Sequence, residues 1–202
     1  LIDHPVLMGE LAIAEFEVAG VEHAVALCGR QEADLERLAA DVREICAAQI
    51  RFFGGRPPLD RYVFLVRVNG EGFGGLEHRA SSALVCQRND LGRQPLREAT
   101  REYRQFLALV SHEYFHLWNV KRIQPAEFAQ SDLSREAFTR QLWIFEGITS
   151  YYDDLLLLRS GRITAPQYLE LLGRTLSNVY RTPGRRRQTL EDSSFDAWIK
   201  FY

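Results

Sequence analysis

Residues 111–120 read SHEYFHLWNV and contain two of the five histidines in the chain. His112 and His116 are four residues apart, and Glu113 directly follows the first of them. Successive residues of an α-helix are rotated by about 100°, so side chains four apart project from one face, one turn from each other. The stretch therefore predicts a helix with two imidazoles that reach one metal ion and a carboxylate beside them.

The pattern H-E-x-x-H places two ligands and one base within little more than one helical turn. Imidazole nitrogens bind zinc at about 2.0–2.1 Å, and both rings reach that distance from a single ion. Glu113 lies roughly 60° around the helix from His116, which favours contact with a water molecule over ligation. A chain of this composition contains the pattern by chance in roughly one case in a hundred. The alternative, a helix with two surface histidines, is weakened because the apolar Leu109 and Phe115 lie near them.

The segment around the motif is predicted to be helical almost throughout. One helix covers about residues 95–119, a second covers residues 135–159, and a third begins at Thr164, with Pro166 in its first turn. Gln167 stands where it completes a capping box with Thr164. The first helix carries one apolar stripe at spacings of three and four: Tyr103, Phe106, Val110, Tyr114 and Leu117.

The first half of the chain has the patterns of strands. Residues 8–28, 62–68 and 82–86 are predicted strands. Residues 32–53 are a predicted helix that the glycines at 54 and 55 stop. The expected fold is α+β, with a β-rich lobe over residues 1–90 and a helical lobe over residues 91–202. Together the two lobes form one catalytic domain fragment, with the motif helix near their junction.

Catalytic zinc takes three protein ligands and keeps a fourth position for water, so a third ligand is needed. Glu146 lies in the apolar run WIFEGI, where a carboxylate is costly to bury unless it is paired or binds a metal. Glu127 and Glu136 are weaker candidates because their neighbours are polar. A purely structural zinc site would need a fourth protein ligand, but the remaining histidines lack ligand spacing to the motif: His4, His23 and His78.

The stretch HEYFHLWNVKRIQP, followed by WIFEGITSYYDDL with its glutamate thirty residues after His116, resembles the glycyl aminopeptidase family of zinc metallopeptidases. The resemblance covers most of the chain, and the residues WNVKR beyond the zinc motif make it specific. It implies a thermolysin-like (gluzincin) catalytic domain. It also implies that His112, His116 and Glu146 bind Zn²⁺ and that Glu113 is the catalytic base.

Residues 74–78, GGLEH, look like the G-x-M-E-N stretch of related aminopeptidases. That likeness implies a substrate-binding loop and edge strand with Gly74 and Gly75, in which Glu77 holds the α-amine of a peptide. His78 departs from the asparagine of those relatives, although glycyl aminopeptidases carry histidine there. An ordinary exposed hairpin is the alternative. A dinucleotide-binding reading of GEGFGG over residues 70–75 is rejected because no helix is predicted to follow it.

The predicted function is a zinc-dependent aminopeptidase that hydrolyses small N-terminal residues, glycine or alanine, from peptides with a free N-terminus. The alternatives are a zinc endopeptidase in which Glu77 is structural, and a non-catalytic metallopeptidase-like binding domain. The oxyanion of the reaction needs a further donor. The candidates are Tyr151, Tyr152 and Tyr180. Each of them could instead be an ordinary core residue.

Composition limits the partners and the compartment. The 25 basic and 27 acidic residues give a net charge of −2, which offers no reason to expect nucleic-acid binding, and no apolar run is long enough for a membrane span. Three scattered cysteines favour buried free thiols.

The chain reads as a piece of a longer protein from the bacterial cytoplasm or periplasm. The resemblance implies a further C-terminal helical portion, with the oxyanion tyrosine in a Tyr-x-Lys-Gly stretch, and a PDZ domain. The fragment alone is therefore expected to be weakly active or inactive.

Overall fold

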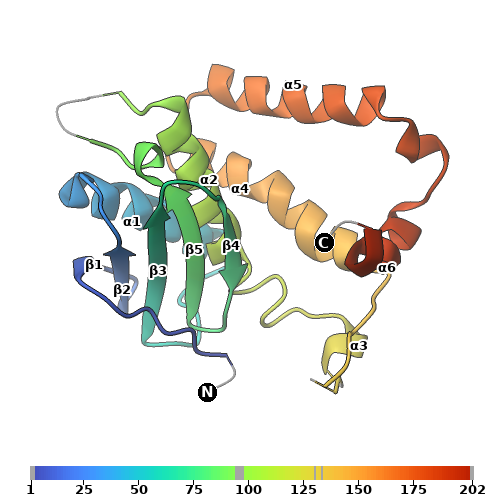
Figure 1. Cartoon of the computed structure of the whole chain (residues 1–202), viewed down its shortest axis with the longest axis horizontal. Coiled ribbons are helices and arrows are strands. Elements are labelled where there is room, and N and C mark those ends of the chain that lie inside the picture. The colour runs from blue at the N-terminus through green and yellow to red at the C-terminus, as the bar shows by residue number, and fades with distance from the viewer. Residues whose placement is uncertain (1–2, 94–97, 130, 133, 201–202) are drawn as a thin grey trace.

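The computed structural model describes residues 3–93, 98–129, 131–132 and 134–200 (Figure 1). Its strands are β1 (Leu11–Val18), β2 (Val21–Cys28), β3 (Arg61–Asn69), β4 (Gly74–Glu77) and β5 (Ser81–Gln87). Its longer helices are α1 (Leu35–Phe52), α2 (Arg101–Phe115), α4 (Ile148–Arg159), α5 (Ala165–Arg181) and α6 (Leu190–Lys200). Short helical turns are η1 (Arg88–Asp90), α3 (Ala126–Ala129), η2 (Trp143–Gly147) and η3 (Pro183–Arg186). The expected α+β class is confirmed.

The five strands form one sheet in the order β1-β2-β3-β5-β4. Strands β2, β3 and β5 are parallel neighbours, whereas β1 and β4 pair antiparallel at the two edges. The chain crosses from β2 to β3 through α1, as a parallel pair requires. Strand β4 lies outside β5, so the residues predicted to bind substrate occupy an edge strand whose outer side has no partner strand among the described residues.

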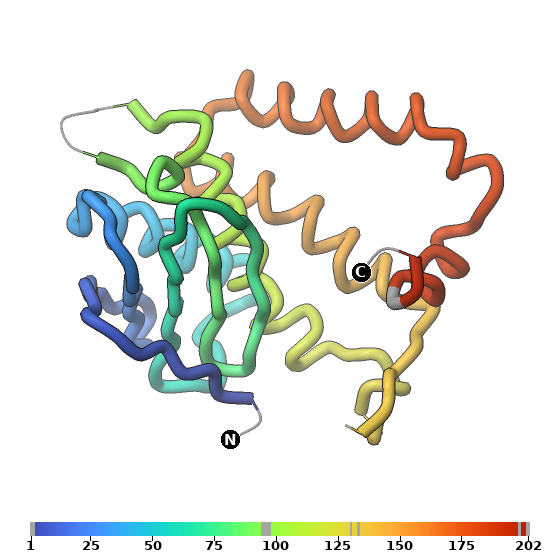
Figure 2. Tube along the Cα trace, viewed as in Figure 1, coloured from blue at the N-terminus to red at the C-terminus, as the bar shows by residue number. Residues whose placement is uncertain are grey.

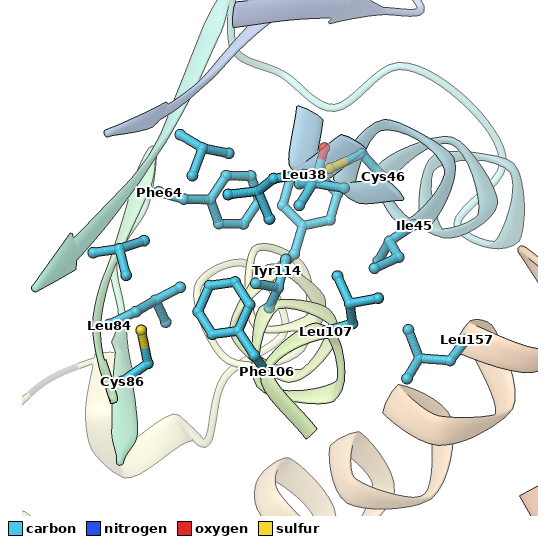
Figure 3. Packing of buried hydrophobic residues seen from close by; sticks show 14 of the residues in the cluster. Leu38, Ile45, Cys46, Phe64, Leu84, Cys86, Phe106, Leu107, Tyr114 and Leu157 are labelled. Atoms are coloured by element: carbon cyan, nitrogen blue, oxygen red, sulfur yellow. The ribbon is translucent and has the colours of Figure 1, made fainter. Parts of the chain in front are cut away.

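Helices α1 and α2 pack on the sheet, and α4 packs on α2 (Figure 1). Figure 3 shows Phe106 and Tyr114 of α2 beside Phe64 of β3 and Leu84 of β5, with Leu157 of α4 on the other side of α2. All five residues of the predicted stripe on α2 are buried. The motif helix is therefore held between the sheet and α4, and its position is determined by burial on two sides.

The structure corrects three predicted helix boundaries; residues 95–97 of the first predicted helix lie outside the described residues. Helix α2 begins at Arg101, because the Thr100 hydroxyl accepts a hydrogen bond from the Tyr103 amide at 3.1 Å and caps the helix. It ends at Phe115, and residues 116–118 form a turn. The segment predicted to be helical from residue 135 becomes helical only near residue 142. Before that point the Thr139 hydroxyl accepts from the Gln141 amide, a local bond that competes with helix formation.

The start of α5 follows the sequence prediction. Thr164 is its N-cap, and Gln167 completes the capping box, with its side chain 2.9 Å from the Thr164 amide. Helix α5 extends away from the sheet and contacts mainly α4 and η3 (Figure 2).

None of the helices in the described part of the chain has the length and apolar character to cross a membrane. All three cysteines are free thiols; Cys46 and Cys86 are buried and Cys28 is half-buried. The division into lobes at residue 90 stays a prediction.

His23 is buried in the core of the sheet, beneath the motif helix. Its Nδ1 donates to the Val21 carbonyl at 2.9 Å, and its Nε2 accepts from the Tyr114 hydroxyl at 2.9 Å. Both bonds suit a neutral imidazole. Burial lowers the pKa of His23 from 6.5 to about 4, against a smaller opposite effect of the bond to Val21. The folded state therefore disfavours protonation of this ring.

We expect His23 to make stability depend on pH between 6.5 and 4. A histidine whose folded pKa is depressed adds stability above its unfolded pKa, and this stability is lost as the pH falls, by about 2–3 kcal/mol at pH 4.5. Urea unfolding of wild type and His23→Gln at pH 7 and pH 4.5 measures this effect. The variant should be less stable at pH 7, and the difference should narrow at pH 4.5. A difference that does not change with pH contradicts the prediction.

Candidate metal centre

Helix α2 and the segment η2–α4 bring three candidate ligands together. Nε2 of His112 lies 3.3 Å from Oε2 of Glu146, and Nε2 of His116 lies 3.7 Å from the same oxygen. In a tetrahedral zinc site with bonds of about 2.0–2.1 Å, ligand atoms are about 3.3 Å apart. These separations fit a zinc ion among the three atoms. Two imidazoles and one carboxylate are also a donor set typical of catalytic zinc.

The other nitrogen of each imidazole is already bound. Nδ1 of His112 lies 2.9 Å from Oδ2 of Asp153, and Nδ1 of His116 lies 2.8 Å from the carbonyl oxygen of Asn119. Because both partners are acceptors, each Nδ1 donates, and each Nε2 faces the space beside Glu146, where it can bind a metal when it carries no proton. Such partners orient metal-binding histidines and raise their basicity.

Glu146 lies on a π-helical turn, η2 (Trp143–Gly147), at the start of α4. A π-turn places one additional residue in the helix and leaves its carbonyls poorly satisfied; such turns are frequent at functional sites. The Asn119 side chain donates to the carbonyls of Ile144 at 3.3 Å and Phe145 at 3.4 Å. The same amide also lies 3.1 Å from the Thr149 hydroxyl. Asn119 thus connects the turn after α2 to the turn that carries Glu146.

The charges of the three candidate ligands depend strongly on one another. Burial disfavours the charged form of His112, but its hydrogen bonds to Asp153 and Glu146 outweigh this effect and raise its pKa to about 10. Burial also opposes ionisation of Glu146, yet the bonds to both histidines lower its pKa to about 2. The site therefore favours positive charge next to the Glu146 carboxylate. A divalent cation would supply that charge in place of protons.

Glu113 lies in the same helix turn but has a different environment. Its side chain is buried, and Oε2 has no hydrogen-bond partner among the described residues. Burial raises the pKa of Glu113 to about 7, although the two histidines oppose this shift. A buried carboxylate with one unpaired oxygen and a pKa near neutral has the properties of a general base.

The edge strand β4 lies directly against Glu113. A Cβ atom added at Gly75 would lie 2.5 Å from Cδ and 2.6 Å from Cγ of Glu113, whereas one added at Gly74 would meet nothing within 4 Å. Only glycine allows the backbone of β4 to approach the Glu113 carboxylate this closely. Position 75 therefore controls the space between the edge strand and the candidate base.

Glu77, at the end of β4, also lies near the site. Ligand atoms of Glu77, Glu113 and His116 all lie within 4.8 Å of one another. Oε1 of Glu77 is 3.3 Å from Nζ of Lys121, which belongs to the turn after α2. Glu77, which was predicted to hold a substrate amine, thus lies beside the candidate base Glu113. It also forms an ion pair with Lys121.

Other residues considered from the sequence lie apart from this group. Nδ1 of His78 bonds to the Leu76 carbonyl at 3.1 Å, and His78 belongs to none of the metal-capable groups among the described residues. The same is true of Glu127 and Glu136. Tyr152 stacks on Phe115, with ring centroids 5.6 Å apart. The other two tyrosine candidates, Tyr151 and Tyr180, have exposed side chains.

Sequence reasoning missed three residues that shape the site: Asn119, Lys121 and Asp153. Asp153 follows Glu146 by seven residues, which is two helical turns, so the helical period was a usable signal for it. Asn119 and Lys121 lie within the stretch WNVKR that carried the family resemblance, but local spacing assigns them no role. Their contacts join residues that are far apart in the sequence.

Comparisons with known proteins agree with the geometry. Residues 105–202 match the model of the family described as M61 glycyl aminopeptidase. No curated protein matches the chain. The crystal structure of an aminopeptidase N family protein from Idiomarina loihiensis is similar to this chain, with a TM-score of 0.93 and 48% identity. The similarity covers 96% of this chain and 33% of that protein, so the chain spans about a third of its length. The family match over residues 105–202 and this likeness support the M61 glycyl aminopeptidase family for this chain.

Proposed function

We propose that this chain carries the catalytic site of a zinc-dependent aminopeptidase. One observation carries the proposal: His112, His116 and Glu146 converge at separations that suit one tetrahedral ion, next to the partly unpaired carboxylate of Glu113. The match of residues 105–202 to the model of a glycyl aminopeptidase family supports the same reaction class.

The chemistry that zinc supplies in such a site is Lewis acidity toward water and toward the carbonyl of the substrate. Glu113 takes a proton from the attacking water and then gives it to the nitrogen of the leaving amine. Its raised pKa supports both steps, because a base with a pKa near the working pH can accept and release a proton. Asp153 and Asn119 hold the two imidazoles in the required orientation.

Substrate binds along β4 in this proposal. The outer side of an edge strand offers amide and carbonyl groups to an added peptide strand. Gly74 leaves space for it, and Gly75 lets the strand approach the Glu113 carboxylate. The Glu77 carboxylate receives the α-ammonium of the peptide, which limits cleavage to the first residue, and His78 borders this end of the strand. A small first residue, glycine or alanine, accords with the glycyl aminopeptidase family whose model residues 105–202 match.

A zinc endopeptidase is the second candidate, and one observation favours it. Lys121 already lies 3.3 Å from Glu77, so this carboxylate has a counter-ion without any substrate amine. Under that reading Glu77 is structural.

We also propose that the full-length protein has a further C-terminal helical portion and a PDZ domain. The chain spans about a third of the solved protein that it resembles, which leaves room for such parts.

Zinc content is the first measurement. Protein purified without chelator should contain about one zinc ion per chain, and Glu146→Ala should weaken zinc binding by at least tenfold because it removes one of three ligands. Glu136→Ala is the matched control, since Glu136 lies outside the metal-capable groups of the described residues. Full zinc retention in Glu146→Ala would contradict the ligand assignment.

Gly75→Ala should lower kcat at least tenfold in the zinc-loaded protein, because the new methyl group displaces the Glu113 carboxylate from its position. Gly74→Ala should change kcat less than about threefold, since a methyl group at that position meets no atom. Steady-state hydrolysis of alanine amide, with zinc content measured on the same samples, tests this difference. Equal kcat values for the two variants would contradict the close approach of β4 to the base.

Glu77→Ala should separate the two candidate functions. For an aminopeptidase, kcat/KM for a peptide with a free N-terminus should fall about 10²-fold or more, because a charge-assisted bond to the ammonium is lost. The value for the N-acetylated peptide should remain low and change little. If wild type cleaves the acetylated peptide as well as the free one, the endopeptidase reading replaces the aminopeptidase reading.

A further inference from the structure

Lys121 is placed between two carboxylates at the end of the candidate substrate strand. Its Nζ lies 3.3 Å from Oε1 of Glu77 and 3.9 Å from Oδ1 of Asp3, and its side chain is 23% exposed. The Lys121 amide donates to the His116 carbonyl at 3.1 Å, so its backbone is attached to the end of the metal-binding helix. Lys121 is one of only two lysines in the chain.

The backbone directly before Lys121 is strained. Val120 has φ of 141°, a conformation that costs a β-branched residue about 1–3 kcal/mol. The surrounding turn maintains it, with the Arg122 amide donating to the Trp118 carbonyl at 3.1 Å and with Asn119 bridged to Ile123. Such strain persists where neighbouring contacts over-determine the backbone, and it marks a side chain whose position matters.

We propose that Lys121 is an internal competitor of the substrate ammonium: it neutralises Glu77 in the free protein and transfers to Asp3 when a peptide amine binds. This inference rests on the proposed aminopeptidase function and names a residue that sets selectivity for the free amine. One carboxylate cannot hold two ammonium groups at full strength, because the two cations repel each other at this distance.

Asp3 is prepared to receive the displaced lysine. Its Oδ2 accepts from the Arg79 amide at 2.8 Å, which fixes the carboxylate, while Oδ1 lies on the side of Lys121. The Arg79 guanidinium lies 3.9 Å from the same Oδ2. Lysine has a flexible stem, so rotation about its side-chain bonds is enough to shorten the distance to Asp3 while the backbone stays in place.

This exchange makes the charge of the substrate a condition for binding. An N-acetylated peptide carries no cation at its first residue, so it leaves Lys121 on Glu77 and gains no bond to that carboxylate. A free ammonium pairs with Glu77, and the long 3.9 Å contact of Lys121 with Asp3 becomes a close ion pair. The selectivity for a free N-terminus therefore depends on Asp3 and Lys121 as well as on Glu77.

The test uses zinc-loaded Glu113→Gln protein, which slows turnover, with lysine side chains carrying ¹³C at the ε position. Its NMR spectrum contains two lysine signals, and Lys200, paired with Asp196 on α6, is the internal reference. Glycinamide should shift the Lys121 signal and leave the Lys200 signal in place, whereas N-acetylglycinamide should shift neither. Glu77→Gln should abolish the response of Lys121.

Affinities from the same titrations supply the second readout. Lys121→Met should bind glycinamide about three- to tenfold more tightly than the parent, and Lys200→Met should not change the affinity. Asp3→Asn should weaken binding by a similar factor, because the displaced lysine loses its acceptor. In the Lys121→Met background, Asp3→Asn should have no further effect, which distinguishes the exchange from a general electrostatic effect of Asp3.

Weaker glycinamide binding by Lys121→Met would overturn the inference and would mean that Lys121 positions Glu77. An equal response of Lys121 to the acetylated ligand would overturn it too. The absence of glycinamide binding in every zinc-loaded variant would overturn both this inference and the anchoring role of Glu77. Failure of the proposed function gives a different result: the wild-type protein then lacks zinc or does not hydrolyse alanine amide, and this holds whether or not the Lys121 signal shifts.

Discussion

The hydrogen bonds of Asn119 connect the two helical segments on which the candidate metal centre depends. Its backbone carbonyl orients His116, and its side chain donates to the carbonyls of the π-turn that carries Glu146. A metal site tolerates ligand errors of only about 0.5 Å, so the two segments must stay in register. Because one residue bonds to both, a displacement of either segment breaks its bonds to Asn119. The geometry of the turn after α2 is thereby coupled to the position of the candidate ligand Glu146, 27 residues after Asn119.

Packing beneath the site makes that coupling rigid. Helix α2 is buried between the sheet and α4, with Tyr114 against Phe64 on one side and Leu107 near Leu157 on the other (Figure 3). The Ser111 hydroxyl donates to the Asp153 carbonyl at 2.9 Å, directly next to the carboxylate that orients His112. Close-packed interiors have little free volume and transmit strain, so the ligands are held by the core as well as by their own hydrogen bonds.

The two carboxylates near the histidines have opposite electrostatic environments, which allows them different chemistry. Burial raises the pKa of Glu113 to about 7. At Glu146 burial acts in the same direction, but the hydrogen bonds and charges of the two histidines together outweigh it and lower the pKa to about 2. Environments that drive two pKa values apart allow the two carboxylates different roles. The edge strand adds a third carboxylate, Glu77, and Lys121 compensates its charge. Glycine at position 75 lets these groups share a small volume.

The sequence by itself determined features that depend on near neighbours. His112, Glu113 and His116 share a helix turn because the helical period acts over four residues, and the stripe on α2 and the cap at Thr164 follow from the same local rules. The apolar neighbours of Glu146 already favoured it over Glu127 and Glu136 as a third ligand. Tertiary structure alone decided that Glu146 lies beside the histidines, that Asp153 and Asn119 orient them, and that Lys121 meets Glu77. It also decided that the segment after residue 135 does not become helical until about residue 142. These features depend on contacts between residues far apart in the chain, whose energies no local period encodes.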